Sequence, residues 1–257
     1  MLSLLLLAGT VAASSWERTK DERMPGELRF ANEGLSHDDE FWYFTGKFFF
    51  YKVNKAPLQI VQETYHAIPD ELKEQGYDHI GDVEVLDGIL YGGMEGKSPG
   101  ILGRWNTTTL EIIDYQEIPE QSGAPWVTID PYTKLLYSSD WNSDTINIYD
   151  STTLTLVKQM SMVDVEGYPK EIQGASFYKG DLYLATNVED GVFKLNIETG
   201  AFDLALKDDD NYVIDKYYYE MEGLTFWDLS EEGFGQMHMY GNFMNGREKA
   251  IHNFKEA

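Results

Sequence analysis

Cysteine is absent from the 257 residues of this chain, which excludes disulfides and thiol chemistry. Basic residues are scarce, because 20 Lys and Arg stand against 44 Asp and Glu and the net charge at pH 7 is −24. This charge repels the phosphates of nucleic acids and the headgroups of anionic membranes, so we expect neither as a partner. An acidic surface attracts cations such as calcium, although it also keeps a protein soluble without any such role.

Long apolar runs are also lacking, apart from a short one at the N-terminus. The segment Leu2 to Leu7 is apolar, small residues follow at positions 8, 9, 12 and 13, and no charge precedes Glu17. This segment is too short to span a membrane, and it resembles a secretory signal peptide. We therefore predict a signal peptide over residues 1–15 and a secreted, extracellular protein with a single domain over residues 16–257. An uncleaved anchor or a buried strand is the alternative.

Two further features fit an exported protein. The sequon Asn106-Thr107-Thr108 lies in a predicted turn, and we expect Asn106 to carry a glycan. Hydrophobic residues make up 42% of the chain and aromatic residues 14%, which favours half-buried sheet surfaces and a large packed core. Such a core is what an exported chain without disulfide cross-links needs. The main helical candidate is Pro69 to Gln75, with acidic residues in its first turn and Gly76 after its end.

A short pattern recurs five times along the chain. Each copy begins with a small residue, continues as an alternating apolar strand and leads through a turn into a second strand. Taken at positions 34, 81, 125, 174 and 223, the copies start 47, 44, 49 and 49 residues apart. Third and fourth strands follow in most copies, and four strands per repeat are typical of a propeller blade. The sequence therefore predicts an all-β, five-bladed β-propeller, with six blades as the alternative.

The two ends of the chain are expected to complete one blade together. The fifth copy stops after its third strand, while residues 27–31 are a predicted strand that belongs to no copy. Pairing this N-terminal strand onto the last blade closes the ring and removes open sheet edges. We therefore predict ring closure by residues 27–31.

The first strands of the blades should line the central channel, so polar residues at their starts and in the loops after the second strands are expected to meet there. Asp82 and Glu84 alternate with valines on one such strand and so share a face, where burial of charge is costly without a partner. Oxygen donors of this kind suit calcium, although Arg, Lys or water could equally compensate the pair. The candidate metal ligands are Glu33, Asp82, Glu84, Asp140, Asn142, Asn187 and Glu222. Glu95 and Gln173 are expected in the same region.

Catalytic motifs are missing. The five histidines show no H-E-x-x-H spacing, and there is no G-x-S-x-G elbow or phosphate-binding loop in a strand-to-helix context. His37 and His79 lie next to first strands and are the candidate catalytic bases, although each could be structural. Trp141 and Trp105 are candidate ligand-stacking residues, with packing between blades as the alternative.

The blade starts Glu222-Gly223-Leu224-Thr225-Phe226, Glu33-Gly34-Leu35 and Ile80-Gly81-Asp82-Val83 carry a family resemblance. On the basis of these blade starts, residues 27–254 resemble the calcium-dependent propellers of gluconolactonases, paraoxonases and strictosidine-synthase-like proteins. The resemblance implies a central cation that polarises a lactone or ester carbonyl. Its ligands here would be Glu33 or Glu222, Asn187, and Asp140 or Asn142.

Two functions from different classes remain open at this point. The chain is interpreted first as a monomeric extracellular binding protein whose calcium is structural and whose partner is a protein, a glycan or a small molecule. The alternative is a calcium-dependent hydrolase of small esters or lactones. Fold alone cannot choose between them, since propellers host many unrelated functions.

Overall fold

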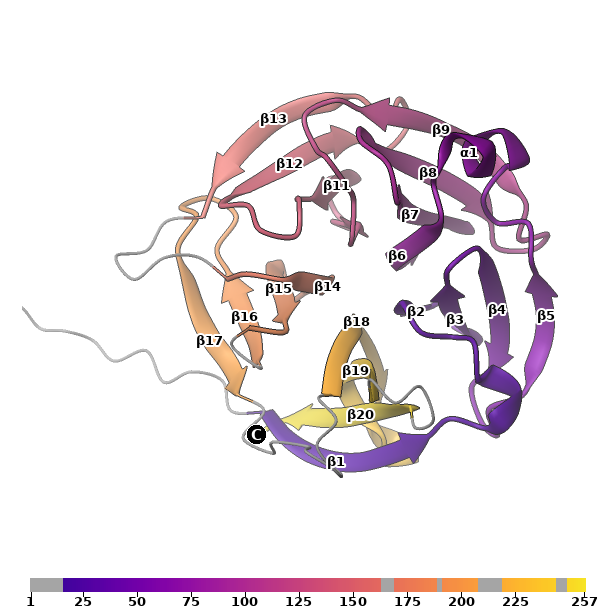
Figure 1. Ribbon diagram of the computed structural model, residues 1–257. Coiled ribbons are helices and arrows are strands. Elements are labelled where there is room, and N and C mark those ends of the chain that lie inside the picture. Colours follow the sequence, from indigo (N-terminus) through magenta and orange to yellow (C-terminus); the bar gives the residue numbers. More distant parts are fainter. Residues whose placement is uncertain (1–15, 163–168, 189–190, 208–218, 244–248) are drawn as a thin grey trace, which may run out of the picture.

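The computed structural model describes residues 16–162, 169–188, 191–207, 219–243 and 249–257. They form five four-stranded antiparallel sheets arranged around a central axis (Figure 1). The predicted five-bladed propeller is therefore confirmed, and the six-bladed alternative is wrong. Residues 1–15, over which the signal peptide is predicted, lie outside the described residues. Within the described part of the chain, no helix has the length and apolarity needed to cross a membrane.

Blades 1 to 4 each run from an inner to an outer strand in chain order. Blade 1 contains β2 (Gly34–His37), β3 (Phe41–Gly46), β4 (Phe49–Asn54) and β5 (Ile60–Thr64). Blade 2 contains β6 (His79–Leu86), β7 (Ile89–Glu95), β8 (Gly100–Asn106) and β9 (Ile112–Ile118). Blade 3 contains β10 (Thr128–Ile129), β11 (Leu135–Ser138), β12 (Thr145–Asp150) and β13 (Leu156–Ser161). Blade 4 contains β14 (Ile172–Tyr178), β15 (Asp181–Thr186), β16 (Gly191–Leu195) and β17 (Phe202–Lys207).

Blade 5 joins both ends of the chain. It contains β18 (Tyr219–Leu229), β19 (Gly235–Phe243) and β20 (Lys249–Glu256), and its outermost strand is β1 (Trp16–Arg23). β1 pairs antiparallel with β20 in a register from Trp16 opposite Glu256 to Arg23 opposite Ala250 (Figure 1). Closure by an N-terminal strand is thus confirmed.

The choice of residues 27–31 as the closing strand was wrong. Most of β1 is solvent-exposed, as expected of an outermost strand, so its sequence carries little of the apolar alternation that marks buried strands. Residues Gly26–Leu28 instead form a short 3-10 helix, η1, in the connection to blade 1. The apolar residues of this connection are needed for packing, because Leu28 and Ala31 are fully buried.

The short helical elements lie outside the sheets. Helix α1 (Asp70–Gln75) connects blades 1 and 2, close to the predicted bounds, and Gly76 ends it in the left-handed conformation with φ of 106°. Its Leu72 is buried in the apolar core between these two blades. A second 3-10 helix, η2 (Ser230–Glu232), connects β18 and β19.

The glycines of the repeat surround one side chain at the axis. A Cβ atom added to Gly34, Gly174 or Gly223 would lie 2.8, 2.9 or 3.0 Å from a carboxylate oxygen of Asp82. Because such contacts are too short for a real Cβ, a larger residue at these starts would displace the blade or the carboxylate. The repeated glycine therefore lets three blades approach the axis around Asp82.

Candidate functional site

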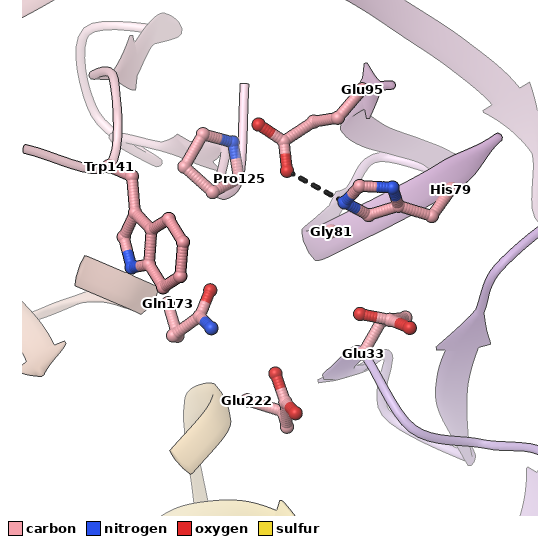
Figure 2. Close-up of a pocket in the computed structure, with 8 residues that line it drawn as sticks. All are labelled: Glu33, His79, Gly81, Glu95, Pro125, Trp141, Gln173 and Glu222. Carbon is pink, nitrogen blue, oxygen red and sulfur yellow. Dashed lines mark hydrogen bonds and ion pairs between the residues drawn. The ribbon is translucent and has the colours of Figure 1, made fainter. Parts of the chain in front are cut away.

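A small cavity of about 110 Å³, here called the inner pocket, lies at the end of the channel where the innermost strands begin. All five blades contribute to it (Figure 2). It is lined by Glu33, His79, Gly81, Glu95, Pro125, Trp141, Gln173 and Glu222. Beside it lies a wider cavity of about 410 Å³, here called the outer groove, whose lining also includes His79, Glu95 and Trp141.

Glu33 immediately precedes β2 and contributes the inner pocket's carboxylate from blade 1. The side-chain amide of Asn32 donates a hydrogen bond to Glu33 Oε1 at 2.6 Å. Burial raises the pKa of Glu33 to about 7, and the negative charge of Glu220 adds to the rise while His79 opposes it. Glu33 therefore titrates near neutral pH.

Glu222 lies in β18 and supplies a second carboxylate. It is only 5% exposed, and the Nδ2 group of Asn242 donates to its Oε1 at 2.6 Å. Burial raises the pKa of Glu222 well above its usual range, and the charges of Glu220 and Glu33 raise it further. Figure 2 shows the carboxylates of Glu33 and Glu222 directed into the same space. A cation in this space would stabilise both ionised groups.

His79 begins β6 and sits between two carboxylates. Its Nε2 lies 2.9 Å from Oε2 of Glu95, and its Nδ1 lies 2.9 Å from Oδ1 of Asp78 (Figure 2 shows the first contact). The hydrogen bond to Glu95 is the main cause that raises the pKa of His79 to about 9. At neutral pH His79 is therefore an imidazolium ion with both ring nitrogens donating, so it lacks the free nitrogen that a catalytic base needs.

His37, the other candidate base, lies at the opposite end of an innermost strand. It ends β2, and its two ring nitrogens lie 2.9 Å from the carbonyl oxygen of Asp38 and 2.8 Å from that of Phe226. Its ring stacks on Trp227 with centroids 4.5 Å apart, and burial lowers its pKa. His37 does not line either cavity. The structure gives it a packing environment rather than access to a ligand.

Asp82 lies on the axis and is completely buried. Its Oδ1 accepts a hydrogen bond from the backbone N–H of Leu35 at 3.0 Å. Its Oδ2 accepts from the backbone N–H groups of Ala175 at 3.1 Å and Leu224 at 3.3 Å. Burial raises the pKa of Asp82 despite these donors. Blades 1, 4 and 5 thus bond to one carboxylate from blade 2.

Glu84 lies two residues further along β6, and its carboxylate accepts hydrogen bonds from side-chain hydroxyl groups. Ser36, Thr128 and Ser176 donate to its carboxylate at 2.9, 3.2 and 2.7 Å. Burial raises its pKa to about 7. Asp82 and Glu84, here called the central carboxylates, therefore have protein donors on all four oxygens. Backbone N–H and hydroxyl groups of the protein therefore compensate this pair.

The other candidate metal ligands do not gather at the pocket. Asp140 Oδ1 accepts from the backbone N–H groups of Ser122 and Gly123 at 2.8 and 3.0 Å, and it borders the outer groove. Asn187 Oδ1 accepts from the N–H of Met221 at 2.8 Å, and Asn142 is exposed and lines neither cavity. Across the described ranges, no group of three or more His, Asp or Glu side chains is arranged to hold a metal ion. Asp140, Asn142 and Asn187, which the resemblance implies as ligands, therefore do not line the inner pocket with Glu33 and Glu222.

The two tryptophans have different environments. Trp141 is 44% exposed and forms a wall of both cavities, as a ligand-stacking residue would. Trp105 is fully buried, donates its indole N–H to the carbonyl oxygen of Ala67 at 2.8 Å and packs edge-on against Phe50. The interpretation of Trp105 as a ligand-binding residue is therefore corrected to a role in the core between blades.

Asn106 ends β8 at the predicted turn. Its Oδ1 accepts hydrogen bonds from the backbone N–H groups of Thr108 at 2.8 Å and Thr109 at 3.0 Å. This arrangement confirms the turn. Glycosylation of Asn106 stays a prediction.

Sequence reasoning placed Glu95 and Gln173 in this region correctly but missed Asn32 and Asp78. These two residues are the chain neighbours of Glu33 and His79, and they orient them. In the sequence, only their positions next to Glu33 and His79 could have indicated these roles.

Comparisons with known proteins address the fold. No family model matches the chain, and no curated protein matches its sequence. Glutaminyl cyclase from Myxococcus xanthus superposes with a TM-score of 0.66 at 9% identity, over 95% of this chain and 98% of that one. A luciferin-regenerating enzyme superposes with a TM-score of 0.58 at 10% identity, over 95% and 90%. Identities this low show a shared fold alone, so the resemblance inferred from the sequence is confirmed only as far as the fold.

Proposed function

We propose that the protein binds a small organic cation, a ligand with an ammonium group, in the inner pocket. The observation that carries the proposal is that the half-buried Glu33 and the buried Glu222 direct their carboxylates into one cavity. The one cationic side chain in the lining, His79, is already bonded to Glu95 and Asp78. The raised pKa values of Glu33 and Glu222 mean that ionising them in the empty pocket is unfavourable. A bound cation stabilises the ionised carboxylates and so offsets this unfavourable free energy of ionisation.

The wall formed by Trp141 favours an organic cation over a bare metal ion. An ammonium group near an indole face is attracted by the ring quadrupole, by about 0.5–2 kcal/mol depending on desolvation. An organic cation also tolerates a site that offers only a few fixed oxygens, whereas calcium takes six to eight. The small volume of the inner pocket suits a small molecule better than a glycan or a protein surface.

The site of action in this proposal is outside the cell. The described fold begins with β1 at Trp16, so cleavage near Ala13 or Ser15 leaves the closing strand whole. N-terminal sequencing of protein recovered from the culture medium of expressing cells tests this, and a protein that stays in the cells with residues 1–15 attached contradicts it.

Calcium-dependent hydrolysis of small esters or lactones is the second candidate. It is supported by the shared fold with two solved enzymes and by the two carboxylates that face one cavity. Its weakness is the ligand set, since Asp140 and Asn187 are engaged with backbone N–H groups. Any calcium in the inner pocket would depend on Glu33, Glu222 and water.

Thermal unfolding separates these candidates, because a ligand of the native state raises the melting temperature. The chelator-treated protein is melted at pH 7.5 with butylammonium, with butanol as the neutral control, and with calcium chloride. We expect butylammonium to raise the melting temperature and butanol not to do so. Glu222→Gln should remove the rise, and Glu198→Gln, at an exposed turn of blade 4, should not. No rise with any ammonium ligand contradicts the proposal, and a rise with calcium alone favours the second candidate.

A further inference from the structure

The outer groove continues the inner pocket toward solvent. The two cavities share His79, Glu95 and Trp141, so a ligand whose head lies in the inner pocket extends into the groove. The inner pocket is too small for more than a head group at about 110 Å³, while the groove offers about 410 Å³. The rest of the groove is lined by Gly96, Lys97, Ser98, Ser122, Gly123 and Asp140. Four of these six residues are glycine or serine, whose small side chains leave space in the groove for the rest of a ligand.

Lys97 is the single Lys or Arg among the residues that line either cavity. It is exposed, and in the described part of the chain its ammonium group has no carboxylate partner; its Nζ lies 6.0 Å from the ring centroid of Tyr77. Asp140, the groove's other unshared charge, has its Oδ1 taken up by Ser122 and Gly123. Lys97 is therefore available to an anionic group on a ligand.

The backbone that carries Lys97 is held against the inner pocket. Lys97 lies in the turn after β7, two residues beyond Glu95, which bonds to His79. A Cβ atom added to Gly96 would lie 2.3 Å from Oδ1 of Asp78, the other carboxylate on His79, and Gly96 has a positive φ of 109°. The turn thus packs directly onto the groups that hold His79 in place. The backbone at position 97 is consequently held beside the inner pocket, and the flexible, exposed side chain of Lys97 carries a positive charge at the outer groove.

We infer that the ligand is a small zwitterion of the amino-acid type, whose ammonium group enters the inner pocket and whose carboxylate meets Lys97 in the outer groove. This inference rests on the proposed function and adds the second charge of the ligand. A site with carboxyl groups at one end and an ammonium group at the other recognises a ligand that carries the complementary pair of charges.

Isothermal titration calorimetry with a series of amino acids of increasing chain length tests the inference. Glycine, β-alanine, 4-aminobutyrate and 6-aminohexanoate are each compared with the amine that lacks the carboxylate: methyl-, ethyl-, propyl- and pentylammonium. At the chain length that spans the two charges, we expect the amino acid to bind about tenfold tighter than its amine, a difference of about 1.4 kcal/mol. Shorter or longer members should show a smaller advantage.

Variants of Lys97 test whether this residue causes the tighter binding of the amino acid. Lys97→Met should abolish the advantage of the amino acid while leaving the affinity of the amine unchanged, and Lys97→Arg should retain the advantage. The inference is overturned if amines bind but no amino acid exceeds its own amine, a result that leaves the proposed function intact. It is also overturned if the advantage persists in Lys97→Met. If the wild-type protein binds neither class, the proposed function fails and the inference fails with it.

Discussion

Replacing Asp82 by alanine should destabilise the propeller more than any other change to its polar groups. The substitution removes the acceptor for three backbone N–H groups, those of Leu35, Ala175 and Leu224, at a site that is completely buried. Each buried donor left without a partner costs about 1–3 kcal/mol. Three donors place the loss between about 3 and 9 kcal/mol, and release of a buried carboxylate offsets part of it. We expect a net loss of about 3–5 kcal/mol and a fall in melting temperature on the order of 10 °C.

Glu84→Gln is the matched comparison, because it changes a carboxylate of the same central pair. The donors to Glu84 are the hydroxyls of Ser36, Thr128 and Ser176. A hydroxyl can rotate and accept from the new amide, whereas a backbone N–H can only donate. Because burial raises the pKa of Glu84 to about 7, the neutral carboxylic acid is already populated at neutral pH. We expect Glu84→Gln to cost below about 1 kcal/mol.

Urea unfolding followed by circular dichroism measures both variants. A shift in the midpoint with an unchanged slope reports a change in the free energy of unfolding alone. The reasoning is refuted if Asp82→Ala unfolds at the wild-type midpoint. It is equally refuted if the two substitutions cost the same, since the argument depends on the difference between fixed and rotating donors.

Three further outcomes are expected. The melting temperature should fall as pH rises from 4.5 to about 7. Folding raises the pKa values of Glu33 and Glu84 from 4.5 to about 7, so these two groups bind more protons in the folded state than in the unfolded chain within this window. A pH series of melting temperatures checks this, and a rise across the window contradicts it. Trp16→Ala should cost about 3–5 kcal/mol in urea unfolding, since this buried ring anchors the closing strand in an aromatic cluster, and an unchanged midpoint would show that closure does not need it. Gly174→Ala should destabilise by more than about 2 kcal/mol, because the new Cβ meets a backbone nitrogen at 2.8 Å, while Gly26→Ala, with open space around it, should leave the melting temperature unchanged.

The architecture could be predicted because it repeats. Five starts at similar spacing, each followed by alternating apolar strands, leave few folds other than a propeller. The closing strand escaped the same reasoning because β1 lies at the outer edge, where solvent-exposed side chains carry no apolar pattern. The signal that does mark it is Trp16, a large apolar residue in an otherwise charged segment, which is buried in the structure.

The site could be predicted only in part. Glu33, His79 and Glu222 were expected at the channel because they start innermost strands, and all three line the inner pocket. The roles of Asp82 and Glu84 could not be derived in this way. Every residue except proline has a backbone N–H, so the sequence does not say which of these groups will converge on a carboxylate. That depends on how closely five blades approach one axis, and glycine at the strand starts was the only trace of it.

Ring closure by β1 also sets an order of events for the folding chain. Thr19 bonds to Asn253, a residue 234 positions later, so β1 has no partner strand until almost the whole chain has been synthesised. Contacts of such long sequence separation form slowly because a large loop must close first. Blades 1 to 4 contain only strands that are adjacent in the chain, and each can form its sheet as it emerges. β1 is therefore made before the strands of blades 1 to 4 but placed after them, and a chain that lacks β20 leaves β1 as an unpaired edge exposed to aggregation.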